Sequence, residues 1–476
     1  MIFNSFHFLF FFIIVTTLYF ILPHKKRWLL LLLSSCYFYM AFVPVYILIL
    51  GFTIVVDYFA AIFIENSAGK KRRLFLVCSL IANIGILCVF KYYNFINTNF
   101  SFLLHGFGLS NPIPYLSILL PIGLSFHTFQ AMSYTIEVYR GKQKTERHFG
   151  IYALYVMFYP QLVAGPIERP QNLLHQFREK HTFDTHRVFE GLKIIIWGLF
   201  KKLVIADRLG IYVNFAYNNV SEQNGATLLL ATLFFSFQVY CDFSGYSDIA
   251  VGTARVMGFN LMTNFRRPVF AKTTGEFWKR WHISLSTWFK DYLYFPMGGS
   301  KVSVPRWYFN LMVVFLISGL WHGANWTYII WGGINGFYLV FAIMTKKYSD
   351  KFNDLTGIKK FPRLYIFFQI GITFLLISFS RIFFRARTVE DAIIIIKKIV
   401  NFKGSVFNDG SAIIIYSFLA ILFLIIVELK KEFYTGSFTL SHHQNFWVRN
   451  SYYSFLIILI ILLGVFDGGQ FIYFQF

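Results

Sequence analysis

Long runs of apolar residues, separated by short polar segments, fill the chain from end to end. Such runs cross a bilayer as helices, because a helix of about 20 residues spans the hydrocarbon core and satisfies its own backbone hydrogen bonds. A membrane β-barrel would instead show short segments of alternating hydrophobicity. The runs predict membrane spans at residues 2–22, 28–43, 45–64, 74–96, 113–138, 149–165, 192–215, 226–251, 307–320, 324–344, 364–384, 411–428 and 451–466.

Several of these runs are short, and Pro44 and Pro121 mark breaks or turns between them. We therefore expect an all-α polytopic membrane protein with about 11 or 12 crossings and one or two re-entrant or interfacial pieces. The amphipathic residues 388–400 are a candidate for such a piece. Because no Ser/Gly/Pro-rich linker interrupts the pattern, we expect a single membrane-embedded domain over residues 1–476.

The basic residues lie in short clusters between the apolar runs, at residues 25–27, 70–73, 140–147 and 346–363. Positive charge favours the cytoplasmic side, so the first three clusters predict a multi-pass membrane protein with its N-terminus outside. The later half is less regular, because residues 346–363 and 381–387 place positive charge at both ends of one span. The first apolar run has no Lys or Arg before residue 25 and no small-residue cleavage site, so we expect it to be retained.

Composition narrows the class of protein further. The chain is 57% hydrophobic and only 14% charged, which excludes a water-soluble domain of this size. Its net charge of +22 does not indicate nucleic-acid binding, because no basic recognition helix or finger motif accompanies it, and membrane lipids are the expected surroundings. The four cysteines show neither metal-ligand spacing nor a disulfide framework, so no metal site is predicted.

Two segments break the pattern of plain spans. Residues 238–248 (QVYCDFSGYSD) place two carboxylates, hydroxyls and an amide at the end of an apolar run, where they either line a water-filled cavity or hold helices together. Residues 274–292 (TGEFWKRWHISLSTWFKDY) predict one amphipathic helix. Its aromatic face would contain Trp278, Trp281 and Trp288, with Glu276 and Arg280 paired one turn apart. An interfacial helix explains the tryptophans and lysines, but it does not explain His282 beside two serines.

The most informative single residue is His322, in the sequence Trp321-His322-Gly323 between two apolar stretches. An ionisable group at bilayer depth is a functional hypothesis, and imidazole is suited to proton transfer near neutral pH. A buried histidine satisfied by a backbone carbonyl is the structural alternative. Without a metal or cysteine, the chemistry that histidine supports best is general-base activation of a hydroxyl for acyl transfer. No phosphate-binding loop, serine elbow or nucleotide fingerprint is present.

At these residues the chain resembles the membrane-bound O-acyltransferase (MBOAT) family, in particular its bacterial alginate O-acetylation branch. The specific stretches are RWHISLSTWFKDYLY at residues 280–294 and SGLWHGANW at residues 318–326. Further similar stretches are residues 1–5, 120–130, 158–177, 238–258, 264–300 and 471–476, so the resemblance covers nearly the whole chain.

The resemblance implies a ring of tilted helices around a central tunnel, where a cytosolic acyl donor meets an extracytoplasmic acceptor. It makes His322 the catalytic histidine and His282 the second active-site histidine. Supporting or substrate-binding roles are predicted for Asp242, Ser286, Trp281, Trp321 and Asn325. His127 departs from the family pattern and is expected to pack, and roles outside catalysis are also expected for His105, His148, His175, His181, His186, His442 and His443.

The function that the resemblance implies is transfer of an acetyl group for O-acetylation of an extracytoplasmic polysaccharide. Acetyl-CoA is the expected donor substrate, with no bound cofactor, and a separate SGNH-type periplasmic or surface acetyltransferase is the expected partner. The alternative within the family is D-alanyl transfer from a carrier protein to teichoic acid, which the turn at residues 294–299 disfavours. An alternative of another class is a proton-coupled transporter or a lipid-linked sugar flippase, although no inverted repeat is evident.

Overall fold

The computed structural model describes residues 1–117, 121–163, 165–406, 411–434, 443 and 445–466. Every regular element within these residues is a helix, as the sequence predicts. The chain divides into two compact units, residues 1–195 with 246–262, and residues 196–245 with those from Thr263 onward. His442 and the closing residues 471–476 lie outside the described residues.

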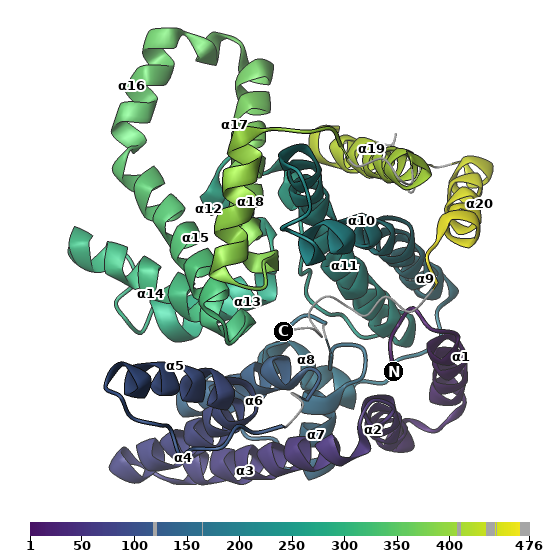
Figure 1. Cartoon of the computed structure of the whole chain (residues 1–476). Helices are drawn as coiled ribbons and strands as arrows, with labels where there is room; N and C mark the ends of the chain where they lie inside the picture. The colour runs from purple at the N-terminus through teal and green to yellow at the C-terminus, as the bar shows by residue number, and fades with distance from the viewer. Residues whose placement is uncertain (118–120, 164, 407–410, 435–442, 444, 467–476) are drawn as a thin grey trace. The chain divides into compact units, whose positions relative to one another are not determined.

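The first unit is built from the N-terminal helices, of which α3, α4 and α6 pack closely on one another (Figure 1). Its elements are α1 (Phe6–Ile21), α2 (His24–Met40), η1 (Pro44–Tyr46), α3 (Ile47–Asn66), α4 (Gly69–Leu87), η2 (Cys88–Tyr92), α5 (Tyr93–Gly106), α6 (Leu124–Tyr139), α7 (Phe149–Met157), α8 (Pro170–Leu173), η3 (His175–Arg178) and most of α9 (Thr185–Leu199).

The second unit contains the segments that carry the candidate chemistry. Its elements are η4 (Phe200–Ala206), α10 (Asp207–Asn218), most of α11 (Gly225–Met257), η5 (Pro268–Phe270), α12 (Thr274–Arg280), α13 (Ile283–Phe289), η6 (Lys290–Tyr294), α14 (Val304–His322), α15 (Trp326–Met344), α16 (Lys346–Thr356), η7 (Ile358–Lys360), α17 (Pro362–Arg385), α18 (Val389–Asn401), α19 (Ser411–Phe433) and α20 (Phe446–Leu463).

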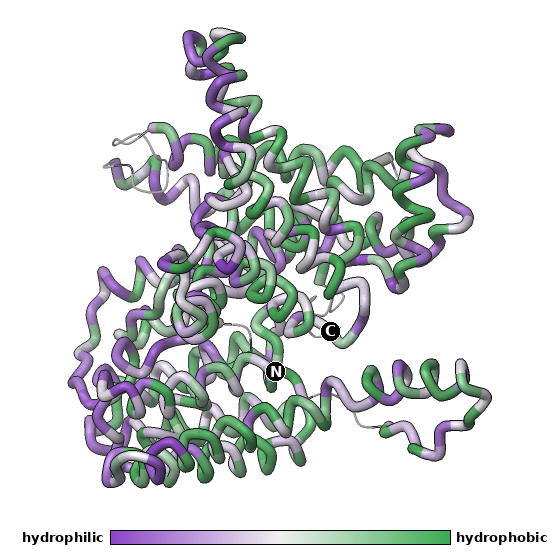
Figure 2. The backbone as a smooth tube through the Cα atoms, turned by 90° about the vertical axis from the view of Figure 1, so that its left-hand side faces the viewer, coloured by the Kyte–Doolittle hydropathy of each residue, from purple (hydrophilic) through white to green (hydrophobic). Residues whose placement is uncertain are grey.

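Eight helices of the described chain are long and apolar enough to cross a membrane. They are Pro44–Asn66, Gly69–Gly106, Gly225–Met257, Val304–His322, Trp326–Met344, Pro362–Arg385, Ala412–Phe433 and Phe446–Leu463. Figure 2 shows these helices as long hydrophobic stretches separated by hydrophilic turns. Their outer faces expose large apolar side chains such as Leu48, Phe52 and Leu462, as expected where lipid is the solvent. The protein is a multi-pass membrane protein.

Some predicted spans differ in length from the observed helices. The runs at residues 2–22 and 28–43 form α1 and α2, with 16 and 17 residues. The predicted span at residues 149–165 is wrong, because α7 ends at Met157 after 9 residues. Pro160 follows closely, and proline disfavours helical backbone in the residue before it. The predicted break at Pro44 is confirmed, and the amphipathic stretch at 388–400 forms α18.

Candidate active site

His322 is the last residue of α14, where the helix ends against Gly323. Gly323 is extended, with φ −163° and ψ 148°, and a Cβ atom at this position would lie 2.1 Å from a ring carbon of Tyr328. Glycine is therefore required by the close approach of that ring and not by backbone conformation. Asn325 then caps α15 by accepting a hydrogen bond from the Thr327 N–H at 3.0 Å, so the turn that carries His322 is fixed at both ends.

Glycines allow α14 and α15 to pack against each other at backbone distance. A Cβ atom on Gly319 would lie 2.3 Å from the Tyr328 carbonyl oxygen, and one on Gly332 would lie 2.3 Å from the Phe315 carbonyl oxygen. Small residues at the contact between membrane helices permit this approach, which larger side chains would prevent. The hairpin therefore holds the His322 backbone rigidly against its partner helix.

His282 lies at a break that the sequence did not reveal. The prediction of one helix over residues 274–292 is wrong, because α12 ends at Arg280 and α13 begins at Ile283. His282 itself has a left-handed conformation with φ 43° and ψ 56°, which costs about 1–2 kcal/mol for a residue other than glycine. The predicted continuous aromatic face therefore does not exist, although the predicted pair of Glu276 and Arg280 is confirmed at 2.6 Å.

The break is held by an extended segment that pairs with it. The Arg266 N–H donates to the Arg280 carbonyl, and the Ile283 N–H donates to the Asn264 carbonyl, both at 2.9 Å. The Asn264 side chain also accepts hydrogen bonds from the Ser284 N–H and hydroxyl, at 3.2 and 2.9 Å. These bonds compensate for the interrupted helix and fix the strained His282 backbone.

The two histidines meet at the indole ring of Trp321. The ring centroid of Trp321 lies 4.9 Å from that of His322 and 6.2 Å from that of His282. Both imidazoles are buried, with 4% and 1% of their surface exposed. Phe243 flanks His282 at 4.6 Å, while Trp331 and Phe384 flank His322 at 5.0 and 5.4 Å; these aromatic rings enclose the pair.

Burial determines the charge of His282. This residue lies outside the candidate membrane spans, and removal from solvent lowers the pKa of its imidazole well below the usual range. A neutral imidazole has one nitrogen that donates and one that accepts a hydrogen bond. His282 can therefore orient a neutral carbonyl or hydroxyl group without introducing charge.

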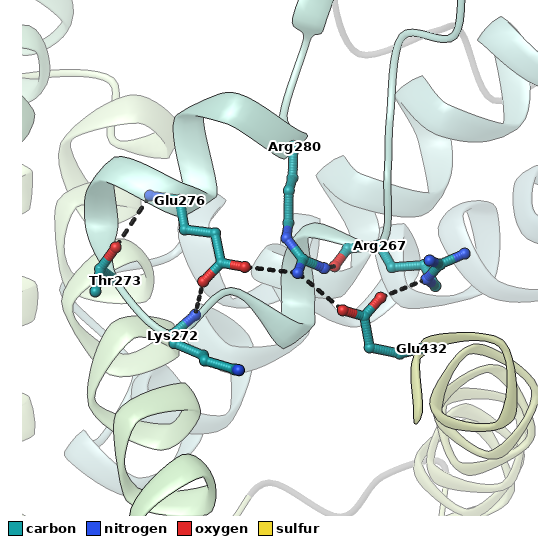
Figure 3. A network of polar contacts seen from close by, with 6 residues as sticks. All are labelled: Arg267, Lys272, Thr273, Glu276, Arg280 and Glu432. Atoms are coloured by element: carbon teal, nitrogen blue, oxygen red, sulfur yellow. Dashed lines mark hydrogen bonds and ion pairs between the residues drawn. The ribbon is translucent and has the colours of Figure 1, made fainter. Parts of the chain in front are cut away.

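An ion-pair network holds α12, the helix that leads into His282 (Figure 3). Arg280 donates to Glu276 at 2.6 Å and to Glu432 of α19 at 2.8 Å, and Arg267 donates to the other oxygen of Glu432 at 2.7 Å. The helix is also capped by Thr273, whose hydroxyl accepts from the Glu276 N–H. The network ties α12 to the preceding loop and to α19.

A small pocket lies beside Trp281. Its enclosed volume is about 10 Å³, room for about one water molecule. Arg381 of α17 lies in its wall, 4.7 Å from the Trp281 ring centroid and 5.6 Å from that of Phe277, and donates to the Ser236 carbonyl at 3.0 Å. Its lining residues are Ser236, Tyr240, Pro268, Val269, Phe277, Trp281, Thr373, Phe374, Ile377 and Arg381. The pocket thus reaches the residue immediately before His282.

The remaining predicted site residues lie in supporting positions. Asp242, which we expected to help orient an imidazole, accepts a hydrogen bond from the buried Lys202 ammonium at 2.6 Å. Lys202 also pairs with Asp207 at 2.7 Å, so this part of the polar segment holds α11 against η4. The Ser286 hydroxyl donates to the Trp281 carbonyl at 3.3 Å and supports the break from within α13.

The sequence reasoning missed Asn264 and Arg381. Asn264 is a buried polar residue directly before Phe265, but only long-range pairing gives it a role. In the sequence Arg381 stands out only as a charge that flanks a span, although a basic residue four positions inside the end of an apolar helix is itself unusual. Among the described residues, no three His, Cys, Asp or Glu side chains gather to hold a metal ion.

Comparison with known proteins defines the class. The sequence profile of the membrane-bound O-acyltransferase family matches residues 140–384, which contain both histidines. The peptidoglycan O-acetyltransferase of Helicobacter pylori is 35% identical over 397 residues, covering 78% of this chain and 73% of that protein. The probable alginate O-acetylase AlgI of Pseudomonas aeruginosa is 38% identical over 331 residues, covering 69% and 61%. The chain therefore belongs to the membrane-bound O-acyltransferase family, and it is an O-acyltransferase.

A more distant similarity bears on the alternatives. The teichoic acid D-alanyltransferase of Streptococcus thermophilus is 29% identical over 266 residues, which cover 52% of this chain and 63% of that protein. The chain thus spans less than two thirds of this relative and of the alginate O-acetylase. Membership of the family sets aside the transporter and flippase hypotheses.

Proposed function

We propose that the protein takes an acetyl group from acetyl-CoA on the cytoplasmic side of the inner membrane and relays it outward for O-acetylation of a polysaccharide. The observation that supports this most strongly is the pair of buried histidines that both lie beside the Trp321 ring, inside an aromatic enclosure. A water-poor site protects a thioester from hydrolysis and strengthens polar interactions with the reacting groups. Two relatives, an alginate O-acetylase and a peptidoglycan O-acetyltransferase, favour acetyl as the transferred group.

His322 acts as the general base in this proposal. Its imidazole removes the proton from an acceptor hydroxyl, and the hydroxyl oxygen attacks the thioester carbonyl carbon. The C–O bond forms as the C–S bond breaks, and the imidazolium returns the proton to the departing thiolate. His282, held neutral and fixed by Asn264, orients the thioester carbonyl or the acceptor.

We propose that the donor arm reaches the histidines past Trp281, where the mostly apolar walls of the small pocket suit the alkyl segments of a pantetheine chain once they part to admit it. We further propose that the acetyl group passes to a separate SGNH-type acetyltransferase on the outer side. Either donor or acceptor would reach the histidines from the side of Trp281.

Release of free thiol from acetyl-CoA by the purified protein tests this function. We expect slow thioester hydrolysis by the wild type, because water replaces the natural acceptor, and a loss of about 10²–10⁴-fold in His322→Ala. His105→Ala is the matched control, since His105 lies near the end of α5, far from the aromatic enclosure in sequence. Hydrolysis that is unchanged in His322→Ala would refute the general-base role.

The same assay separates acetyl from D-alanyl transfer. If acetyl-CoA is the donor, the thioester of a D-alanyl-charged carrier protein should be hydrolysed no faster than it is without the enzyme. The reverse preference would support the D-alanyl alternative, to which the similarity with teichoic acid D-alanyltransferases points. Both donors carry the acyl group as a thioester, so a difference between their hydrolysis rates reflects the acyl group and its carrier.

The proposed direction of transfer requires the basic clusters to face the cytoplasm. Single cysteines at positions 26, 71 and 144 should resist a membrane-impermeant thiol reagent in intact cells and react after the membrane is opened. Reaction of two of the three positions in intact cells would invert the topology and remove the cytosolic entrance for the donor.

A further inference from the structure

The short helix α16 links two candidate membrane spans of the second unit. α15 ends at Met344 and α17 begins at Pro362, so the residues between them lie where two spans end. Figure 1 shows α16 at this end of α15 and α17, set apart from the other helices of its unit. A segment in this place meets the polar surface layer of a bilayer and not its hydrocarbon core.

Tyr348, Phe352 and Leu355 form an apolar face on α16. They follow one another at i, i+4 and i+7, which places them on one side of the helix. Their exposed fractions are 75%, 65% and 77%, and Phe361 beyond η7 is exposed as well. Large apolar side chains gathered on one exposed face mark a surface that contacts a membrane or another protein.

The contacts that hold α16 lie on its polar side. The Asn353 amide donates to the Tyr365 hydroxyl of α17 at 3.1 Å, and Asp354 pairs with Lys359 of η7 at 2.7 Å. Since each residue of a helix advances by about 100°, the apolar side chains lie about 100–160° around the helix from Asn353. The apolar face is therefore turned away from α17.

Basic side chains surround this face. Residues 346–363 contain six Lys or Arg and two Asp, a net charge of +4. The basic residues are all exposed, and they are Lys346, Lys347, Lys351, Lys359, Lys360 and Arg363. A basic cluster of this size beside a membrane span attracts anionic headgroups, and each basic residue favours the contact about fivefold. Lysine stems can also lie along an apolar surface while their ammonium groups reach the phosphates.

We propose that α16 is an interfacial helix that binds a membrane surface rich in anionic phospholipid. Its apolar face enters the boundary between headgroups and acyl chains, and its lysines contact the lipid phosphates. An acidic protein would match the charge too, but an apolar face directly beside two spans meets the bilayer before it can meet a soluble partner. This surface is separate from the histidine pair and does not depend on the proposed function.

Thiol accessibility in lipid nanodiscs tests the surface in the full-length protein. Leu355→Cys is introduced into a variant that keeps only the buried native Cys241, and its rate of reaction with a water-soluble maleimide is measured. Asp350→Cys is the matched control, because it lies on the polar side of the same helix and meets the same surface potential. When phosphatidylglycerol replaces about 40% of the phosphatidylcholine, the rate at Leu355→Cys should fall at least about fivefold relative to that at Asp350→Cys.

Charge reversal separates recognition of anionic lipid from burial in any lipid. Lys347→Glu combined with Lys351→Glu should abolish the fall in rate at Leu355→Cys. Lys70→Glu combined with Lys71→Glu, an equal change of charge at the start of α4, should leave the fall intact. A rate ratio that ignores lipid charge would mean that neutral lipid or another part of the protein covers the face, and it would overturn the proposal. An equal fall in the α16 charge-reversal variant would overturn it as well.

Discussion

Replacing Gly323 by alanine should disable the site through a single steric contact. The new Cβ atom would lie 2.1 Å from Cε2 and 2.2 Å from Cδ2 of Tyr328, whereas carbon atoms at contact stay about 3.5–4.0 Å apart. The Tyr328 ring must therefore retreat by more than about 1 Å. It packs on Phe384 at 5.1 Å, and Phe384 in turn packs on His322, so the displacement reaches the imidazole.

The magnitude follows from this geometry. Overpacking a buried site costs about 1–3 kcal/mol, so Tm should fall by several degrees. A misplacement of about 1 Å in a reacting group can lower the rate by about 10²-fold, and we expect a loss of that order in hydrolysis of the donor thioester. Gly323 is already extended, so alanine adds no backbone strain and the whole effect is steric.

The control for this experiment lies on the partner helix. A Cβ atom on Gly333 would meet only Leu316 Cδ2 at 3.6 Å, an ordinary contact. Gly333→Ala should therefore keep full activity and gain up to about 1 kcal/mol from helix propensity. Adding Tyr328→Leu to Gly323→Ala should restore part of the Tm. Unchanged activity and Tm in Gly323→Ala would show that the Tyr328 ring moves aside freely, and the assignment of Gly323 as a steric requirement would fall.

Three further outcomes are expected. His282→Ala should strongly lower the rate of thioester hydrolysis. The double variant with His322→Ala should be no more than about threefold slower than His322→Ala alone, because the effects of groups that act as one unit are non-additive. A multiplicative loss of rate in the double variant would show independent roles. Asn264→Ala should release the strained His282 backbone and lower kcat more than it raises KM, and a rise in KM alone would mean that Asn264 serves only substrate binding. Burial raises the pKa of Glu168 to about 7, so the native state binds this proton more tightly than the unfolded state does. The stability of the protein should therefore fall as pH rises from about 4.5 through 7. Glu168→Gln should flatten the dependence of Tm on pH, and an unchanged slope would count against the assignment.

The membrane helices could be predicted because their signals are local. The apolar run at residues 307–320, followed by Trp321-His322-Gly323, predicts most of α14 and the ionisable group at its end. The same holds for the pair of Glu276 and Arg280, which depends only on spacing within one helix.

The break at His282 could not be predicted, because the helical spacing of Trp278, Trp281 and Trp288 continues through it. Hydrogen bonds with Asn264, 20 residues earlier in the chain, stabilise the broken conformation although the local pattern favours one helix. For the same reason the ion pair of Asp242 with Lys202 could not be predicted, since the two residues lie 40 positions apart and nothing in either local sequence links them.

The helical stretch from Gly69 to Gly106, formed by α4, the π-helical η2 and α5, has a consequence for the surrounding lipid. With 38 residues it is about 57 Å long, nearly twice the thickness of a typical hydrocarbon core of about 30 Å. Lys70 at its start and Asn97 near its end, whose amide bonds the Ile113 carbonyl, both favour polar layers. A stretch longer than the hydrocarbon core is accommodated by a tilt, by a kink, for which the π-helical η2 offers a place, or by local thickening of the bilayer. Bilayer thickness then becomes a variable that acts on the protein, and reconstitution in lipids of different acyl-chain length should change the stability of its N-terminal helices.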